Sequence, residues 1–255
     1  MTGLFKSLIL KFFNHYNYDI LSTKYIDKKF NFYKNKHEGQ RCVIIGNGPS
    51  LNQTNLTLLE NEITFGLNKI FLLFPRLTFC PTYLISCIPD VVSQCKEEFQ
   101  KLNIPLFVSN KSKEILKDRK YETHYFGKQK QFIFSLNPAK EICVGHTVTY
   151  VALQLAFFMG FKKVILIGVD HSFNYEGPSD TWHLVEKEVK GRHFVDNYFS
   201  VGQTWQSPNL KMAEAHYALA KSVYEFYNRN IINSTIESKL DVFEKIPLEQ
   251  ALCET

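Results

Sequence analysis

The chain has 255 residues, of which 45 % are hydrophobic and 22 % are charged, so it can bury one large core or two small ones. Its formal net charge of +5 is only mildly basic, and without an arginine-rich stripe or a nucleic-acid motif we expect no nucleic-acid partner. The six cysteines are scattered without CxxC pairs, which argues against a zinc finger and favours a reducing, cytoplasmic setting.

Residues 1–38 differ in character from the rest of the chain. Up to His37 they hold seven lysines against two aspartates, interleaved with large apolar residues. Leu4, Leu8 and Phe12 fall on one face of a helix, so the segment is expected to be a basic amphipathic helix. It either contacts an anionic membrane surface or a partner, or packs on the domain formed by residues 39–255. The apolar stretch LFKSLILKFF near its start is too short to span a bilayer and is broken by Lys6 and Lys11.

From residue 41 onwards, short apolar strands alternate with helices. We expect strands in the segments 42–46, 63–67, 81–87, 104–109, 162–170 and 231–235. We expect helices, or short helical turns, in 55–62, 68–74, 90–102, 148–161 and 209–230. Segments 128–141 and 175–194 are expected to be long loops over the strand ends. Continuous apolar strands between helices predict a Rossmann-like, doubly wound α/β domain whose mostly parallel sheet is covered by helices on both faces.

The first core strand runs directly into the turn Gly46, Asn47, Gly48, Pro49 and Ser50. Ligands of doubly wound sheets bind beyond the carboxyl ends of the strands, and glycine lets the backbone approach them closely. The backbone N–H groups and polar side chains of this turn are suited to phosphate oxygens. The motif is neither G-x-G-x-x-G nor a Walker A loop. It predicts a nucleotide site, with a purely structural tight turn as the alternative.

The strand 162–170 is expected to bring a second polar group to the same edge. Gly168 leads into Asp170 and His171. An aspartate there can accept hydrogen bonds from a ribose or sugar hydroxyl or hold a metal, and a histidine can act as a general base or hold a phosphate. A strand-end cap with a surface histidine is the structural alternative.

Two further groups are expected nearby. Gly145, His146 and Thr147 precede an apolar helix that either Thr147 or Thr149 can cap. The free N–H groups of the helix favour a phosphate or a carboxylate. Asn68 lies at or just past a strand end. Several polar groups at the strand ends together favour a binding crevice over simple capping.

Five segments of this sequence carry a family resemblance, namely IIGNGPSLN, ITFGLNKIFLLF, PTYLIS, GHTVTYVALQLAFFMGFKKVILIGVDHSF and KLDVFEK. Over residues 41–245 the chain resembles the bacterial and archaeal family named for 6-hydroxymethylpterin diphosphokinase-like proteins. The same domain type occurs in flagellin glycosyltransferases of the motility-associated-factor group. The chain also resembles bacterial sialyltransferases that use CMP-sialic acid.

The resemblance implies roles for the residues singled out above. Asn47, Gly48, Ser50 and Asn68 would contact the nucleotide, in a set that includes Gly46, Pro49 and Gly168. Gly145, His146 and Thr147 would hold the sugar carboxylate or phosphate, and Asp170 would face the ribose or the donor sugar. The sialyltransferases have Thr-Ser-Gly where this chain has Gly145-His146-Thr147. They place a catalytic histidine before the last long helix. His193 and His171 are the two candidates here.

Three functions remain open from the sequence. The first is a glycosyltransferase of surface glycan biosynthesis that uses a CMP-activated acidic sugar, such as a sialic acid, another nonulosonic acid or Kdo. It would need no metal and would act on a glycan or lipid-linked acceptor at the inner face of the cytoplasmic membrane. The second is an ATP- and Mg²⁺-dependent diphosphokinase, with Asp170 and Asp90 as metal-holding carboxylates. The third is a non-catalytic nucleotide-binding scaffold.

Overall fold

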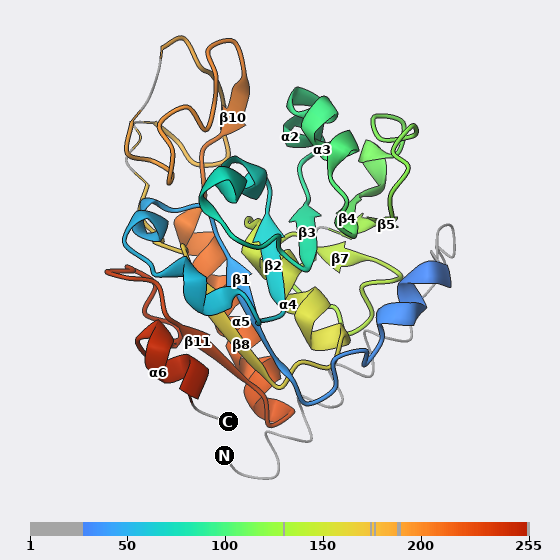
Figure 1. Ribbon diagram of the computed structural model, residues 1–255, viewed down its shortest axis with the longest axis vertical. Helices are drawn as coiled ribbons and strands as arrows, with labels where there is room; N and C mark the ends of the chain where they lie inside the picture. Colours follow the sequence, from blue (N-terminus) through green and yellow to red (C-terminus); the bar gives the residue numbers. More distant parts are fainter. Residues whose placement is uncertain (1–27, 130, 174, 176, 188–189, 254–255) are drawn as a thin grey trace.

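The computed structural model describes residues 28–253, except for residues 130, 174, 176, 188 and 189. Its centre is an eight-stranded, all-parallel sheet in the order β12-β11-β8-β1-β2-β3-β4-β5 (Figure 1). The strands of this sheet are β1 (Arg41–Ile45), β2 (Thr64–Leu67), β3 (Tyr83–Ser86), β4 (Leu106–Ser109), β5 (Thr123–Phe126), β8 (Lys163–Ile167), β11 (Asn230–Asn233) and β12 (Glu244–Lys245).

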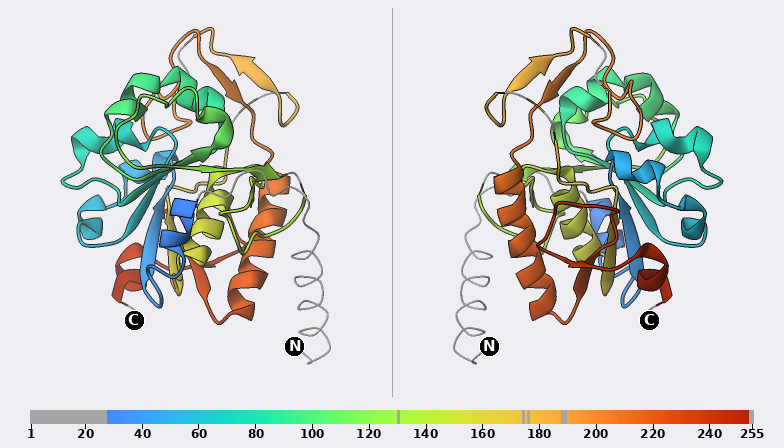
Figure 2. Two further views of the ribbon diagram at one scale, coloured as in Figure 1. Left: turned by 90° about the vertical axis from the view of Figure 1, so that its right-hand side faces the viewer. Right: turned by 90° about the vertical axis from the view of Figure 1, so that its left-hand side faces the viewer.

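The helices cover both faces of the sheet (Figure 2). One face carries η1 (Lys28–Tyr33), α4 (Val148–Phe158) and α5 (Leu210–Phe226). The other face carries η2 (Pro49–Asn52), η3 (Leu56–Leu59), η4 (Ile70–Arg76), α2 (Pro89–Gln94), α3 (Lys96–Lys101) and α6 (Leu248–Cys253). Helix α4 is apolar on almost all sides because it is buried between the sheet and α5. The expected fold class is confirmed.

Strands β1 and β8 lie side by side at the centre of the sheet. Each has four consecutive buried residues, as strands covered on both faces require. Their register pairs Val43 with Ile165 and Ile45 with Ile167, so both strands end at the same level. The turns that follow, at Gly46 and Gly168, are therefore neighbours.

The order of the strands places a topological switch point between β1 and β8. The chain continues from β1 through β2 to β5 on one side, and from β8 through β11 to β12 on the other. Connections that leave two adjacent parallel strands in opposite directions open a crevice at their carboxyl ends. This is where the sequence places its polar turns.

Several elements differ from the sequence-based expectations. Strand β5 forms where no element was expected. The helix expected over 90–102 is interrupted at Cys95, whose φ of −127° and ψ of 36° are not helical. The expected loops contain short strands, namely β6 (Lys128–Gln129), β7 (Ile142–Cys143) and β9 (Trp182–Leu184). Strand β9 pairs antiparallel with β10 (Thr204–Gln206), and the two form a flap that stands beyond the carboxyl edge of the sheet (Figure 1).

The expected N-terminal amphipathic segment, residues 1–38, lies mostly outside the described residues. In its described part, Phe30 and Tyr33 are fully buried and their rings contact Phe107 and His124. This part of the segment therefore packs on the domain. The boundary between residues 1–38 and 39–255 stays a prediction.

The cysteines and the helix lengths can be compared with the sequence-based expectations. All six cysteines are unpaired thiols, and Cys42 and Cys143 are buried as expected. Within the described ranges, no helix is both long and apolar enough to cross a bilayer.

Candidate functional site

The turn after β1 is held tightly against the turn after β8. The N–H of Gly46 donates to the Ile167 carbonyl at 2.8 Å, and the N–H of Gly48 donates to the Gly168 carbonyl at 2.9 Å. A Cβ atom at Gly46 would collide with the Gly168 carbonyl, and one at Gly48 would collide with the Asp170 carboxylate. The two glycines of the motif thus allow two loops of the protein itself to approach each other.

Ser50 and Asp170 bind each other across the switch point. The Ser50 N–H donates to Asp170 Oδ1 at 3.0 Å, and the Ser50 hydroxyl donates to Oδ2 at 2.8 Å. Burial raises the pKa of the Asp170 carboxyl, and the two hydrogen bonds from Ser50 partly oppose that rise. In this structure both predicted ligand contacts are used to join the loops, so neither group is free for a nucleotide.

Asn47 and Asn68 lie at the ends of β1 and β2. Asn47 Nδ2 donates to the Leu67 carbonyl at 3.0 Å, while its buried Oδ1 accepts no hydrogen bond from a described residue. Asn68 adopts a left-handed φ of 48° and accepts a hydrogen bond from Ser86 at 3.2 Å. An unpaired buried acceptor is uncommon in a folded protein, so Asn47 is suited to receive a donor group from a ligand.

Residues 191–203, which we call the covering segment, lie on top of these turns. The N–H of Phe194 donates to the Asn47 carbonyl at 3.2 Å. The side chain of Lys69, at the end of β2, is 2 % exposed and donates to the Tyr198 carbonyl at 2.9 Å and to Gln203 Oε1 at 2.8 Å. Burial lowers the pKa of the Lys69 ammonium. This lysine fastens the covering segment to the sheet.

His193, a predicted general base, belongs to the covering segment. Its ring stacks on Tyr198 with centroids 3.8 Å apart and lies 5.7 Å from Phe173. Burial, with help from the positive charges of Lys69 and Arg192, lowers the pKa of His193 to about 3. In this conformation the imidazole is a weak base at neutral pH.

Lys69 and Arg192 concentrate positive charge above the turn after β1. Arg192 lies over Phe173 and Trp205, with ring centroids 5.3 and 4.9 Å from its guanidinium carbon. Neither cation forms a salt bridge with a described residue, although the more distant Glu98 favours the charged form of Lys69. Poorly neutralised cations beside polar turns favour an anionic ligand.

His171, the second predicted base, is largely enclosed. Its Nε2 lies 3.7 Å from Glu214 Oε2, a contact too long for a hydrogen bond, and its side chain is 8 % exposed. Burial lowers the pKa of His171, and Glu214 opposes that shift. The ring also lies 6.1 Å from that of Tyr217 on α5.

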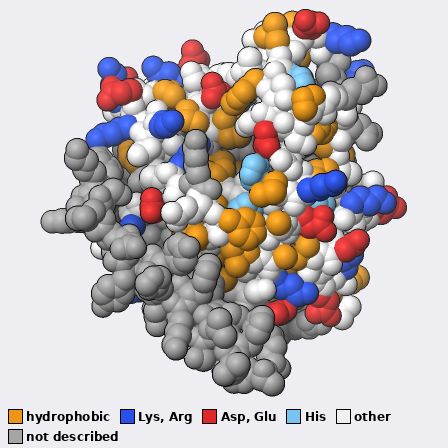
Figure 3. Space-filling view, turned by 180° about the vertical axis from the view of Figure 1, so that it is seen from behind, with side chains coloured by type: hydrophobic (Ala, Val, Ile, Leu, Met, Phe, Trp, Pro, Cys, Tyr) orange, Lys and Arg blue, Asp and Glu red, His pale blue; other side chains and the backbone are white. Residues whose placement is uncertain are grey.

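Gly145, His146 and Thr147 form the start of α4, as expected. Thr147 caps the helix by accepting from the Thr149 N–H at 3.3 Å. Its hydroxyl also lies 3.3 Å from the Tyr217 hydroxyl. His146 points to the flap, where its Nδ1 lies 3.0 Å from Asp180 Oδ1. Histidines and hydrophobic side chains gather beside a hollow below the flap (Figure 3).

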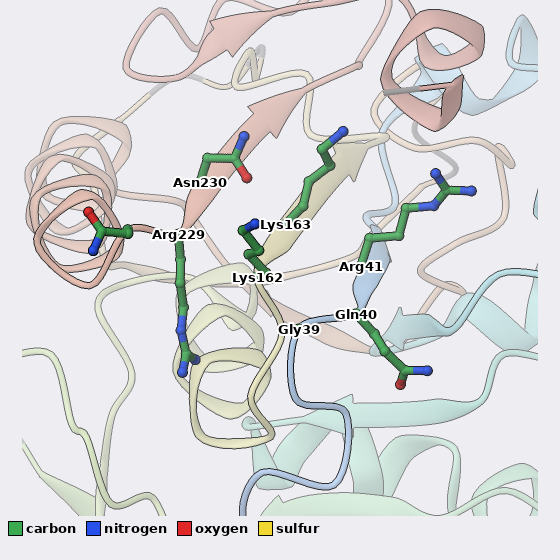
Figure 4. Close-up of a pocket in the computed structure, with 8 residues that line it drawn as sticks. Gly39, Gln40, Arg41, Lys162, Lys163, Arg229 and Asn230 are labelled. Carbon is green, nitrogen blue, oxygen red and sulfur yellow. The ribbon is translucent and has the colours of Figure 1, made fainter. Parts of the chain in front are cut away.

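One hollow lies away from this crevice, and a second adjoins it beside the loops that contain Ser50 and Asp170. One, of about 550 Å³, is at the opposite, amino-terminal edge of the sheet, where Arg41, Lys163 and Arg229 point away from one another (Figure 4). Because Arg41 is already paired with Glu62, this basic hollow does not gather its charges on one ligand. The other, of about 410 Å³, is lined by polar loops after β11 and β12.

Sequence reasoning missed three residues of the crevice. Lys69 directly follows the predicted Asn68, but its lysine type alone predicts an exposed side chain. Arg192 and Asp180 lie in segment 175–194, which was expected to be a loop and in which His193 alone was given a role. Only the folded chain brings them to the predicted groups.

A comparison with known protein families shows to which family the chain is related. Residues 15–176 match the family described as "6-hydroxymethylpterin diphosphokinase MptE-like". The chain belongs to the MptE-like family. This confirms the resemblance seen in the sequence. No match to a curated protein was found.

A solved structure shares the fold of this MptE-like chain. The chain superposes on the MAf glycosyltransferase from Magnetospirillum magneticum AMB-1 with a TM-score of 0.55 and 14 % sequence identity. The match covers 100 % of this chain but 43 % of that one, so this chain spans less than half the length of that enzyme. At this identity the likeness shows a shared fold, which agrees with the expected relation to motility-associated-factor glycosyltransferases.

The described residues of the MptE-like crevice provide few ligands for Mg²⁺. No group of three or more His, Cys, Asp or Glu side chains within the described ranges is arranged to hold a metal ion. Asp170, the first expected metal ligand, uses both oxygens on Ser50. Asp90 lies in the first turn of α2. These residues do not fit the expected magnesium site.

Proposed function

We propose that this protein is a glycosyltransferase that uses a CMP-activated acidic sugar. The observation that carries the proposal is the charge of the crevice at the switch point. Lys69 and Arg192 are cationic and form no salt bridge with a described residue, whereas the carboxylate of Asp170 is bound to Ser50. Cations favour both the single phosphate of CMP and the carboxylate of an acidic sugar. The fold shared with a glycosyltransferase supports the same conclusion.

In this proposal the turn after β1 and the cations bind the donor. Asn47 Oδ1, the unpaired acceptor of the turn, contacts a donor group of the nucleotide, and Lys69 and Arg192 neutralise the phosphate or the sugar carboxylate. Negative charge grows on the phosphate as the bond to the sugar breaks, so the same cations stabilise the transition state. A histidine takes the proton of the acceptor hydroxyl.

The composition of residues 1–38 bears on the acceptor. We propose a glycan or lipid-linked acceptor at the inner face of the cytoplasmic membrane. The support is the basic, aromatic-rich composition of residues 1–38, which suits an anionic membrane surface.

A diphosphokinase is the second candidate, because the family takes its description from that activity. Such an enzyme transfers diphosphate from ATP and uses divalent metal at the phosphates. The poor fit of Asp170 and Asp90 to a magnesium site makes us prefer the glycosyltransferase. A nucleotide-binding scaffold remains the outcome if neither reaction occurs.

Ligand-induced thermal stabilisation tests the choice. A ligand that binds only the folded state raises the melting temperature. We expect CMP and CTP to stabilise the protein without Mg²⁺, and Asn47→Ala to reduce the shift because it removes the unpaired acceptor that Asn47 Oδ1 offers to the ligand. Asn52→Ala is the matched control, since Asn52 is exposed just after the same turn. Stabilisation only by ATP with Mg²⁺ would favour the diphosphokinase, and no shift with any nucleotide would contradict a nucleotide site in this crevice and leave a scaffold that binds no nucleotide.

A further inference from the structure

His146 and Asp180 form a hydrogen-bonded pair at the mouth of the crevice. His146 Nδ1 lies 3.0 Å from Asp180 Oδ1. The other carboxylate oxygen accepts a hydrogen bond of 2.7 Å from Asn209 Nδ2. Because an ionised carboxylate only accepts hydrogen bonds, Nδ1 must carry a proton, so in the neutral form of the imidazole Nε2 has the free lone pair. This is the tautomer that a general base requires.

Both residues adopt a backbone conformation that non-glycine residues rarely take. The φ angle is 60° at His146 and 61° at Asp180. A backbone hydrogen bond fixes the chain at each of these positions. The N–H of Thr147, the residue after His146, donates to the Val144 carbonyl at 3.1 Å, and the N–H of Asp180 donates to the Ser207 carbonyl at 3.0 Å. Left-handed non-glycine residues that the surroundings hold in place cluster at functional sites.

A series of contacts links the pair to the turn after β8. Thr147, next to His146, lies 3.3 Å from the Tyr217 hydroxyl, and the Tyr217 ring lies 6.1 Å from that of His171, which follows Asp170. The side chains of His146 and Asp180 are 34 % and 41 % exposed. A substrate hydroxyl can therefore reach His146, whereas His171 is enclosed.

We propose that His146 is the general base of the transfer reaction and that Asp180 is its positioning residue. The assignment rests on the proposed function. His146 Nε2 takes the proton of the acceptor hydroxyl as the acceptor oxygen forms its bond to the anomeric carbon of the sugar. The bond between that carbon and the phosphate oxygen breaks, and CMP leaves with the electron pair. The proton then passes from His146 to water.

The direct test measures the release of CMP from CMP-N-acetylneuraminate and, in parallel, CMP binding. We expect His146→Gln to lower the release rate by about 100-fold or more and Asp180→Asn by about tenfold or more, with CMP affinity within about twofold of wild type. Glu186→Gln is the matched control, since it removes an exposed carboxylate from the same flap. It should release CMP at the wild-type rate.

A second measurement distinguishes a positioning role of Asp180 from a purely structural one. In ¹⁵N spectra of the histidine side chains, His146 should show a protonated Nδ1 in the wild type and lose that preference in Asp180→Asn, but not in Glu186→Gln. A His146→Gln variant that binds and releases CMP at the wild-type rate would overturn the assignment of His146 as the base but leave the proposed function standing. A wild-type protein that neither binds CMP nor releases it would overturn the proposed function, and the assignment with it.

Discussion

Gly48 shows how a single residue fixes the turn after β1. A side chain there would meet the Asp170 carboxylate, which is itself held by two hydrogen bonds from Ser50. The motif therefore needs glycine at this position for a contact inside the protein. The ligand-binding role that we propose for the motif would be a second demand on the same residues.

We expect Gly48→Ala to lower the free energy of unfolding by about 3 kcal/mol, because the added methyl group displaces the Asp170 side chain from a buried, hydrogen-bonded place. Chemical denaturation measures the change. Gly127→Ala is the control, since its new Cβ would meet the Lys140 carbonyl at an ordinary 3.4 Å. Equal losses in the two variants would show that the contact at Gly48 is not the cause.

At the scale of elements, the covering segment is held by one buried cation. Lys69 bonds to the Tyr198 carbonyl and to Gln203, and its ammonium lies 4.6 Å from the centre of the Phe199 ring. Burying a charge without a carboxylate partner costs free energy of folding. Removing the Lys69 ammonium therefore relieves this cost at the same time as it loses the hydrogen bonds.

We expect Lys69→Met to speed amide hydrogen exchange across residues 191–203, because the segment loses both hydrogen bonds to the end of β2. Global stability should change by less than about 1 kcal/mol, since the lost bonds are offset by relief of the buried charge. Lys101→Met, at an exposed position of α3, should leave the exchange unchanged. Exchange as slow as in the wild type would mean that the remaining contacts, which include the Phe194 N–H bond to Asn47, hold the segment without the Lys69 side chain.

The flap shows how an element forms from residues that predict a loop. Strand β9 has three residues, and its pairing places His183 beside Trp205 with ring centroids 4.7 Å apart. Such a short strand leaves no periodic pattern in the sequence. The stacked rings, brought together by the antiparallel pairing, stabilise it.

The whole molecule should respond to acid through His193. In the folded protein the pKa of His193 is about 3, whereas the unfolded chain has the ordinary value of 6.5. Between these values the unfolded chain binds a proton that the folded chain does not, so stability falls as the pH falls from about 6.5. The slope contributed by this group is at most about 1.4 kcal/mol per pH unit.

We expect His193→Phe, which keeps an aromatic ring against Tyr198, to flatten the loss of unfolding free energy between pH 6.5 and pH 4. Denaturant titrations at several pH values measure the slope. The variant should match wild type most closely above pH 7, where His193 is neutral in both states. An unchanged slope would mean that the ring of His193 is protonated in the folded protein.

The sequence by itself determined the parallel core and the edge of the sheet that carries the site. Runs such as KVILI are apolar enough to be buried on both faces, and the polar turns at their ends follow directly in the chain. It also singled out Asn47, Ser50, Asp170 and His146, because side chains at the carboxyl ends of neighbouring strands share one edge.

Only the tertiary structure decided which of those groups bind one another. Ser50 and Asp170 are 120 residues apart, Lys69 and Tyr198 are 129 apart, and His146 and Asp180 are 34 apart. Local patterns determine where a strand ends and which residue types follow it. They contain no information about which distant loop folds over that end, because the loop is placed by packing across the whole sheet and not by its own sequence.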